Sequence, residues 1–151
     1  MSLSGRTRDE IQALVARFPE RRSALLPALK VAQREQGWLP PETIAETADV
    51  VGVPHSAALE IAEFYTMLHT EPGPTTRVVV CAQLPCALRG AEQLIRELRS
   101  ELHDRDTIEV ERTSECFGAC HRAPMARVDD LYYENLDGEG RKALIAELTR
   151  G

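Results

Sequence analysis

Apolar residues in the first 70 positions recur at intervals of three and four, the spacing of amphipathic helices. The first predicted helix presents Ile11, Leu14, Val15 and Phe18 on one face and ends at Pro19. Three further helices are predicted, with apolar faces formed by Leu25, Leu29 and Ala32, by Ile44, Ala45, Ala48 and Val51, and by Ile61, Phe64, Tyr65 and Leu68. The pattern therefore predicts a four-helix bundle.

Glycine and proline residues mark the ends of these predicted helices. Ser23 is the expected cap of the second helix, and Gly37 is expected just past its end. Gly52-Val53-Pro54 separates the third helix from the fourth. Residues 70–74, Thr-Glu-Pro-Gly-Pro, form a proline-rich linker. We therefore predict a helical domain over residues 1–72 and a second domain over residues 73–151.

The second half of the chain mixes strand and helix patterns. A short β-branched run is typical of a buried strand, and a second segment alternates as a half-buried strand. The predicted elements are a strand at 77–81, a helix at 91–102, a strand at 107–111, a hairpin at 126–128 and 131–133, a turn at 137–140, and a helix containing Leu144, Ile145 and Leu148. The order β-α-β-β-β-α, with one further short strand allowed, is that of a small thioredoxin-like domain. The fold class is thus α/β (α+β).

Composition and charge restrict the possible functions. The chain has 151 residues, of which 43% are hydrophobic and 28% charged, as in an ordinary globular protein. A formal net charge of -6 argues against nucleic-acid binding, which needs a basic stripe. We expect no secretory signal and no membrane span, because no apolar stretch approaches the required length. A cytosolic chain would keep its cysteines reduced.

Four cysteines, the only ones in the chain, form two tight pairs: Cys81-x4-Cys86 and Cys116-x3-Cys120. Each pair follows a predicted strand, so the two loops are expected to share one site. Four thiolates indicate a metal centre, and an iron–sulfur cluster is the favoured interpretation. A structural zinc ion would explain the ligand count equally well, and unligated cysteines remain a third possibility. Thiol–disulfide catalysis is disfavoured because no C-x-x-C is present.

Several residues near the cysteines could influence such a centre. Gly118 permits a positive φ, which would let a backbone N–H point at sulfur. Pro85 and Pro124 stiffen the two loops. Arg89 and Arg122 lie just beyond the cysteine loops and could offset a cluster's negative charge or meet a partner, but a solvated surface position is favoured for both. His121 follows Cys120, but no second histidine lies in the matching loop, so a surface role is favoured over ligation.

The sequence lacks the motifs that bind nucleotides or build a metalloprotease site. No G-x-G-x-x-G follows a strand, and neither a P-loop nor an H-E-x-x-H occurs. A redox centre without a site for NADH or a flavin implies that another subunit performs the catalysis.

Four segments in order resemble those of one known family: residues 37–40 (Gly-Trp-Leu-Pro), residues 64–67 (Phe-Tyr-Thr-Met), Cys81-x4-Cys86 followed by Ala-Leu-Arg-Gly-Ala-Glu, and Cys116-x-Gly-x-Cys120-x3-Pro. From about residue 24 to 136 the chain resembles the thioredoxin-like 2Fe-2S ferredoxin that serves as the E-type subunit of bacterial NADH–quinone oxidoreductase (complex I). Related proteins serve NAD-reducing hydrogenases and formate dehydrogenases. The segment between Cys86 and Cys116 looks shorter than usual by several residues.

The resemblance implies that Cys81, Cys86, Cys116 and Cys120 bind one 2Fe-2S cluster. It also implies that a partner flavoprotein subunit holds FMN and oxidises NADH, and that the helical domain embraces this partner. The chain would then be an electron carrier of the peripheral arm, located in the cytoplasm and associated with the inner membrane only through the complex. By itself it is expected not to oxidise NADH.

Overall fold

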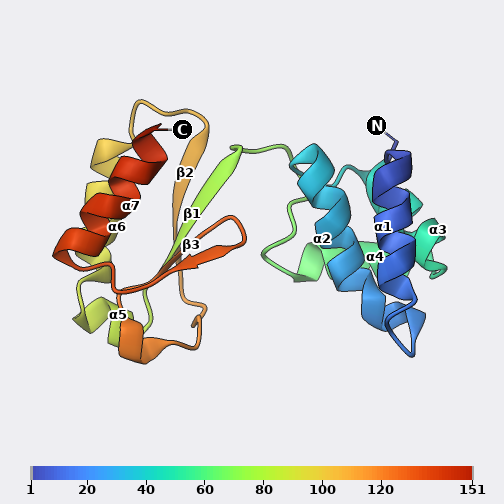
Figure 1. Cartoon of the computed structure of the whole chain (residues 1–151), viewed down its shortest axis with the longest axis horizontal. Coiled ribbons are helices and arrows are strands. Elements are labelled where there is room, and N and C mark those ends of the chain that lie inside the picture. The colour runs from blue at the N-terminus through green and yellow to red at the C-terminus, as the bar shows by residue number, and fades with distance from the viewer. Residues whose placement is uncertain (1, 151) are drawn as a thin grey trace. The chain divides into compact units, whose positions relative to one another are not determined.

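The structure is a computed structural model that describes residues 2–150. The chain divides between Gly73 and Pro74 into two compact units, which we call unit 1 and unit 2 (Figure 1). Each unit has its own hydrophobic core. Among the described helices, none has the length and apolar character needed to span a membrane.

Unit 1 consists of four α-helices and a short 3₁₀ helix, in agreement with the predicted bundle. The elements are α1 (Gly5–Val15), η1 (Arg21–Ala24), α2 (Leu25–Gln36), α3 (Pro41–Val51) and α4 (His55–Phe64). Their apolar faces meet in one core, where Ile11, Leu25, Leu29 and Val51 are completely buried. Burial of these aliphatic side chains stabilises the bundle.

Some expectations about the helices of unit 1 are confirmed and others are wrong. Gly52 ends α3 in the left-handed conformation, as the predicted break requires. Gly37 ends α2 in the left-handed conformation, with φ 80°, as predicted. Ser23 does not cap α2, because it lies inside η1, whose turn leads directly into the helix.

The first helix, α1, ends at Val15, so, contrary to the prediction, it does not include Phe18. Phe64 does not face the core. It is the last residue of α4 and is 77% exposed, in edge-to-face contact with Tyr65.

The segment that leads into α1 is fastened to α3 by one carboxylate. Glu46 accepts hydrogen bonds from the Leu3 backbone N–H (2.8 Å) and the Ser2 hydroxyl (3.0 Å), and it pairs with Arg8. Partial burial pushes the pKa of Glu46 upward, but the bonds from Leu3, Ser2 and Arg8 outweigh it and leave the pKa below the usual 4.5. The carboxylate therefore binds these donors best in its charged form.

We expect the Glu46→Gln variant to lower the free energy of unfolding of unit 1 by about 1–2 kcal/mol at neutral pH. Because the folded pKa is lowered, this stabilisation is present above the ordinary glutamate pKa and is lost as the pH falls through the lowered one. The measurement is urea unfolding followed by the fluorescence of Trp38, the only tryptophan. The exposed Glu63→Gln is the control, and equal losses in both variants would contradict the prediction.

Unit 2 is a four-stranded sheet with helices, as the predicted β-α-β-β-β-α order requires. Its elements are β1 (Thr76–Cys81), α5 (Leu84–Leu88), α6 (Ala91–Glu101), β2 (Ile108–Thr113), η2 (Cys120–Arg122), β3 (Ala126–Val128), β4 (Leu131–Tyr133) and α7 (Gly138–Arg150). The strand order is β2-β1-β3-β4, with β1 parallel to β2 and the other pairs antiparallel. The α+β thioredoxin-like fold class is confirmed.

Two local features of unit 2 differ from the sequence expectation. The first cysteine loop contains the short helix α5, which starts with Leu84-Pro85 because proline fits the first turn of a helix. Residues 137–140 are not a separate turn, since α7 already begins at Gly138. Gly140 is packed too closely for a side chain there, because a Cβ would collide with the Asn135 carbonyl oxygen.

The sheet of unit 2 has two unlike faces. Val78 and Val80 are completely buried in the core formed with Leu94 and Leu98 of α6. In Figure 1, α6 and α7 lie on the same side of the sheet. Strand residues alternate between faces, so Val79 points to the other one. Side chains on the face packed against α6 are covered by the helix, so only the opposite face of the sheet can meet a partner protein.

Candidate metal centre

The two cysteine loops meet at the carboxyl end of β1. Cys81 is the last residue of that strand, and its N–H donates to the Met125 carbonyl at 3.1 Å. The next residue, Ala82, donates to the Thr113 carbonyl at the end of β2, at 2.9 Å. The first loop is thus bonded both to the segment that precedes the second cysteine pair and to the segment that follows it. The sheet topology brings together two loops that are distant in sequence.

The first pair of thiols is buried. Cys81 and Cys86 are 1% and 2% exposed, and Cys86 lies in α5. Burial raises the pKa of the Cys86 thiol to about 11, and the neighbouring Cys81 adds to the increase. Two bare thiolates would repel each other in this position. A bound cation is therefore the natural way to hold both sulfurs in their charged form.

The second pair is exposed and already close. Cys116 Sγ and Cys120 Sγ are 3.7 Å apart. Gly118 adopts a φ of 80° between them, as its position suggested, and its N–H donates to Cys116 Sγ at 3.4 Å. The hydrogen bond with Cys116 raises the pKa of Cys120, and burial and the charges of Cys116 and Cys81 act in the same direction.

The two pairs lie within electrostatic reach of each other. The pKa of Cys120 responds to Cys81, and the pKa of Cys86 responds to Cys120. All four cysteines are free of disulfides. In the part of the chain that the structure describes, no three His, Cys, Asp or Glu side chains gather around one point that could hold a single ion. Two neighbouring pairs of thiols match the donor set of a two-iron cluster, in which each iron takes two protein ligands.

The other residues singled out from the sequence lie around this centre without touching sulfur in any hydrogen bond that the structure shows. Arg89 is exposed, and Pro124 is buried behind a cis peptide bond with Ala123. Arg122 pairs with Glu134, so its charge is already matched, and its Nε lies 3.3 Å from the exposed His121 ring. The effect of these residues on the charge or rigidity of a cluster therefore stays a prediction.

Two contacts at the site escaped the sequence reasoning. The Gln83 side-chain amide donates to the Ser114 carbonyl and so ties the first cysteine loop to the second. Phe117, between Cys116 and Gly118, meets Tyr132 of β4 edge to face, with ring centroids 5.4 Å apart. Glutamine has no fixed role in loops, and the Phe117–Tyr132 pair depends on the hairpin geometry, so the sequence carried no signal for either contact.

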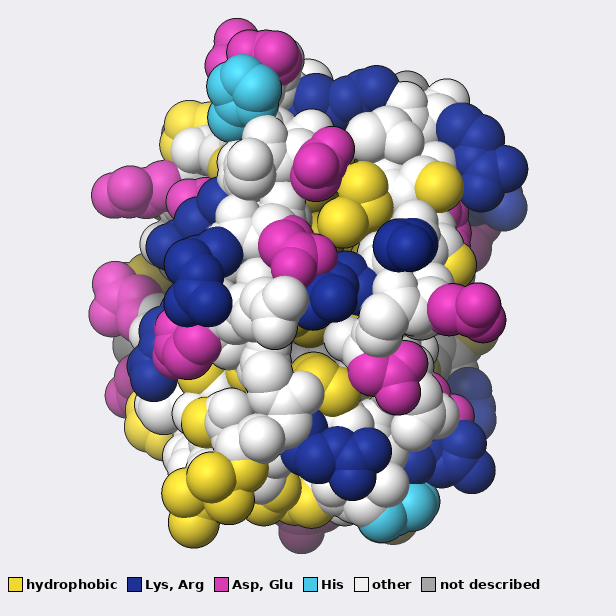
Figure 2. All heavy atoms as spheres, turned by 90° about the vertical axis from the view of Figure 1, so that its left-hand side faces the viewer, with side chains coloured by type: hydrophobic (Ala, Val, Ile, Leu, Met, Phe, Trp, Pro, Cys, Tyr) yellow, Lys and Arg dark blue, Asp and Glu magenta, His cyan; other side chains and the backbone are white. Residues whose placement is uncertain are grey.

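Exposed apolar side chains lie beside the first thiol pair. Leu84 and Leu88 of α5 are 68% and 79% exposed. Figure 2 shows hydrophobic side chains gathering at the lower end of unit 2, where α5 lies in Figure 1, whereas the rest of that face mixes charged groups of both signs with other polar and scattered hydrophobic side chains. Exposed leucines next to a metal centre suit a surface that meets another protein.

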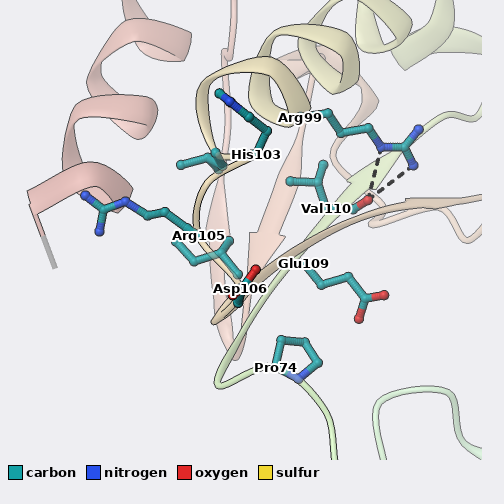
Figure 3. A pocket seen from close by; sticks show the side chains of 9 residues that line it. Pro74, Arg99, His103, Arg105, Asp106, Glu109 and Val110 are labelled. Atoms are coloured by element: carbon teal, nitrogen blue, oxygen red, sulfur yellow. Dashed lines mark hydrogen bonds between the residues drawn. The ribbon is translucent and has the colours of Figure 1, made fainter.

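A pocket of about 400 Å³ lies at the other end of β1 and β2, where Pro74 and Ile108 line it (Figure 3). At its edge, the Nε and Nη2 atoms of Arg99 both donate to the Val110 carbonyl, at 3.3 and 3.2 Å. Because β2 is an edge strand, Arg99 occupies part of a hydrogen-bonding edge that would otherwise be open. No cysteine lines this pocket, so it is separate from the thiol site.

A mixed sheet that brings two pairs of free thiols together at one strand end defines a class: small α/β proteins that hold a metal centre through paired cysteines. Comparison with known proteins makes the class specific. The chain belongs to the thioredoxin-like [2Fe-2S] ferredoxin family, whose pattern matches residues 11–149. Four cysteine thiols are the ligand set that a 2Fe-2S cluster of this kind requires.

Relatives cover nearly the whole chain. One of them, an E-type subunit of NADH-quinone oxidoreductase from Rhizobium meliloti (strain 1021), is 41% identical over 144 residues, which is 91% of this chain and 86% of the relative. The E-type subunit of NADH-quinone oxidoreductase from Rickettsia bellii (strain RML369-C) is 35% identical over 144 residues, with 89% and 86% covered. These identities confirm the family resemblance found in the sequence.

A solved structure shares the fold. The crystal structure of NAD⁺-reducing [NiFe]-hydrogenase in the H₂-reduced state matches with a TM-score of 0.66 and 21% sequence identity. The match covers 83% of this chain but only 22% of the hydrogenase chain. At this identity the likeness shows the common architecture alone.

Proposed function

We propose that this chain is the electron-transfer subunit of an NADH–quinone oxidoreductase, with one 2Fe-2S cluster bound by Cys81, Cys86, Cys116 and Cys120. The observation that carries the proposal is the convergence of two free thiol pairs at the end of β1. The relatives that are E-type subunits of NADH-quinone oxidoreductase, one of them 41% identical over most of the chain, support the parent complex. The cluster, when bound, accepts and releases one electron.

The protein's own residues prepare the site for that cluster. The buried first pair keeps water away from one side, because Cys81 and Cys86 are almost inaccessible. The exposed second pair leaves the other side open to an electron donor. The Gly118 N–H directs a partial positive charge at Cys116 Sγ, which favours the additional negative charge of the reduced state.

The electron donor in this proposal is FMN on a partner flavoprotein subunit that oxidises NADH. The chain itself offers none of the common nucleotide-binding motifs, so it acts as a part of the enzyme and not as an enzyme alone. We further propose that residues 1–72 and 73–151 are separate domains, that the first meets the flavoprotein, and that the protein works in the cytoplasm at the membrane-bound complex. The hydrogenase likeness supports only the fold, so the respiratory complex is the preferred parent.

Iron, acid-labile sulfide and zinc assays on anaerobically purified protein test the cofactor. The proposal requires about two irons and two sulfides per chain and an EPR signal that appears on reduction. A colourless protein with one zinc per chain would show instead a structural metal site. Co-purification with an FMN-containing subunit, and NADH oxidation only in its presence, tests the assignment to the complex.

We expect Gly118→Ala to keep the cluster but lower its reduction potential, on the order of tens of millivolts. A Cβ at Gly118 meets no atom within 4 Å, but the φ of 80° strains any other residue, so the loop relaxes and the N–H moves away from Cys116 Sγ. The matched control is Gly37→Ala, which has the same φ of 80° and an equally open environment in unit 1. Potentiometric EPR should show a shift in the first variant only.

A further inference from the structure

One face of the sheet in unit 2 carries a row of side chains that do not belong to the hydrophobic cluster packed with α6, although Val79 in this row is itself buried. Val79, Arg127 and Tyr132 lie side by side on β1, β3 and β4 in the register of the strands. Their neighbours Val78, Val80 and Ala126 point to the opposite face, into the core with α6. We call the Arg127–Tyr132 side of the sheet the open face.

Arg127 is the unusual member of this row. Its side chain is half-buried, and its Nε has no accessible surface and no hydrogen-bond acceptor. It is the only such buried side-chain polar atom among residues 2–150. No residue in that range forms an ion pair or a hydrogen bond with the guanidinium. A buried donor without an acceptor is unfavourable, so an acceptor supplied by a bound group would stabilise Arg127.

The other arginine of the open face already has its anions. Arg77 pairs with Glu109 at 2.8 Å and with Glu111 at 2.7 Å. The carboxylate of Asp129 accepts the Arg77 backbone N–H at 3.0 Å. Arg127 therefore differs from Arg77 in that no ion pair in the described structure neutralises its charge. The complementary group is an anion, and a carboxylate fits the fork of a guanidinium best.

The open face leads directly to the thiol site. Tyr132 is 60% exposed and contacts Phe117, which lies between Cys116 and Gly118 in the second cysteine loop. Arginine and tyrosine are, together with tryptophan, the residues enriched among the energetic centres of protein–protein interfaces. Arg127, which has no anion, lies beside the exposed Tyr132 and close to the second cysteine loop. These are the residue types expected at the centre of an interface.

We propose that the open face around Arg127 and Tyr132 is the docking site for a partner protein that presents a carboxylate beside an apolar side chain. The partner is the electron-donating flavoprotein subunit, so this inference rests on the proposed function. Its carboxylate binds the Arg127 guanidinium, and its apolar side chain packs on Tyr132. Docking there brings the partner against the loop that holds Cys116 and Cys120.

The test measures the affinity of the cluster-containing full chain for the purified flavoprotein subunit of the same organism. We expect Arg127→Gln to weaken binding roughly tenfold or more, and Arg127→Lys to weaken it less because the charge remains. Arg96→Gln is the matched control. Arg96 is exposed on α6, on the core side of the sheet, and it too has no partner among the described residues. It should bind like the unchanged protein.

Iron content and the EPR spectrum of each variant must equal those of the unchanged chain, which shows that folding and cluster are intact. Equal affinities for Arg127→Gln and the unchanged chain would overturn the docking site but not the proposed function. An unchanged chain that fails to bind the flavoprotein at all would overturn the proposed partner as well. Self-association of the chain that Arg127→Gln abolishes would assign the open face to a second copy instead, and would also overturn the proposal.

Discussion

The Cys116→Ala variant is expected to lose its cluster while both units stay folded. Cys116 belongs to the exposed pair, so its removal leaves no cavity in the core, but it takes away one of four thiolates. Iron should fall from about two per chain to nearly none, together with the visible absorption and the EPR signal. Far-ultraviolet circular dichroism should remain unchanged, because the helices do not depend on the second loop.

The control for this experiment is Ser114→Ala. Ser114 is exposed in the same loop and uses its backbone carbonyl, not its hydroxyl, in the bond from Gln83. This variant should keep its full iron content. A Cys116→Ala protein with an unaltered EPR signal would exclude Cys116 as a ligand.

The second large effect is expected in the core of unit 2. Leu98 of α6 is completely buried against Val78 and Val80, and Leu98→Ala should lower the free energy of unfolding by about 2–5 kcal/mol. The cluster should then be released at a lower urea concentration, which its visible absorption reports. Leu88→Ala removes a leucine that is 79% exposed, and should change the stability by no more than about 0.5 kcal/mol. Similar midpoints for the two variants would contradict this account of the core.

Much of the architecture follows from local sequence patterns. The spacing of Ile11, Leu29 and Val51 predicted helices that bury these residues, and the run ending at Cys81 predicted a buried strand. Both predictions depend on which positions of a helix or strand are apolar, and this can be read from the spacing of apolar residues in the sequence. The positive φ of Gly37 and Gly118 was also predicted, because one lies just past a helix end and the other lies between two cysteines of a tight loop.

Features that depend on tertiary geometry could not be predicted. The ends of α2 and α4 shifted, since a 3₁₀ turn replaced the Ser23 cap and since α4 stops at Phe64. The pairing of Val79 with Arg127 and of Arg127 with Tyr132 depends on the strand order, which periodicity does not give. The isolated guanidinium of Arg127 is invisible in a sequence for the same reason.

At the metal centre, the sequence indicated the four thiols and their expected meeting point at a strand end, but it did not give their unequal environments. Cys81 and Cys86 are buried whereas Cys116 and Cys120 are exposed, because the first loop folds back as α5 while the second stays at the surface. The assignment of all four as ligands remains a prediction that the iron and EPR measurements decide.

The position of β1 in the middle of the sheet sets the order in which the thiol site can be completed during synthesis. β1 emerges from the ribosome first, but the Met125 carbonyl that fastens Cys81 and the strand β3 beside it come more than forty residues later. At a translation rate of about 5–20 residues per second, the first thiol pair waits for several seconds without its partner loop. With the proposed ligands, iron and sulfide can therefore be inserted only after synthesis has passed β3, and until then reducing conditions must protect Cys81 and Cys86.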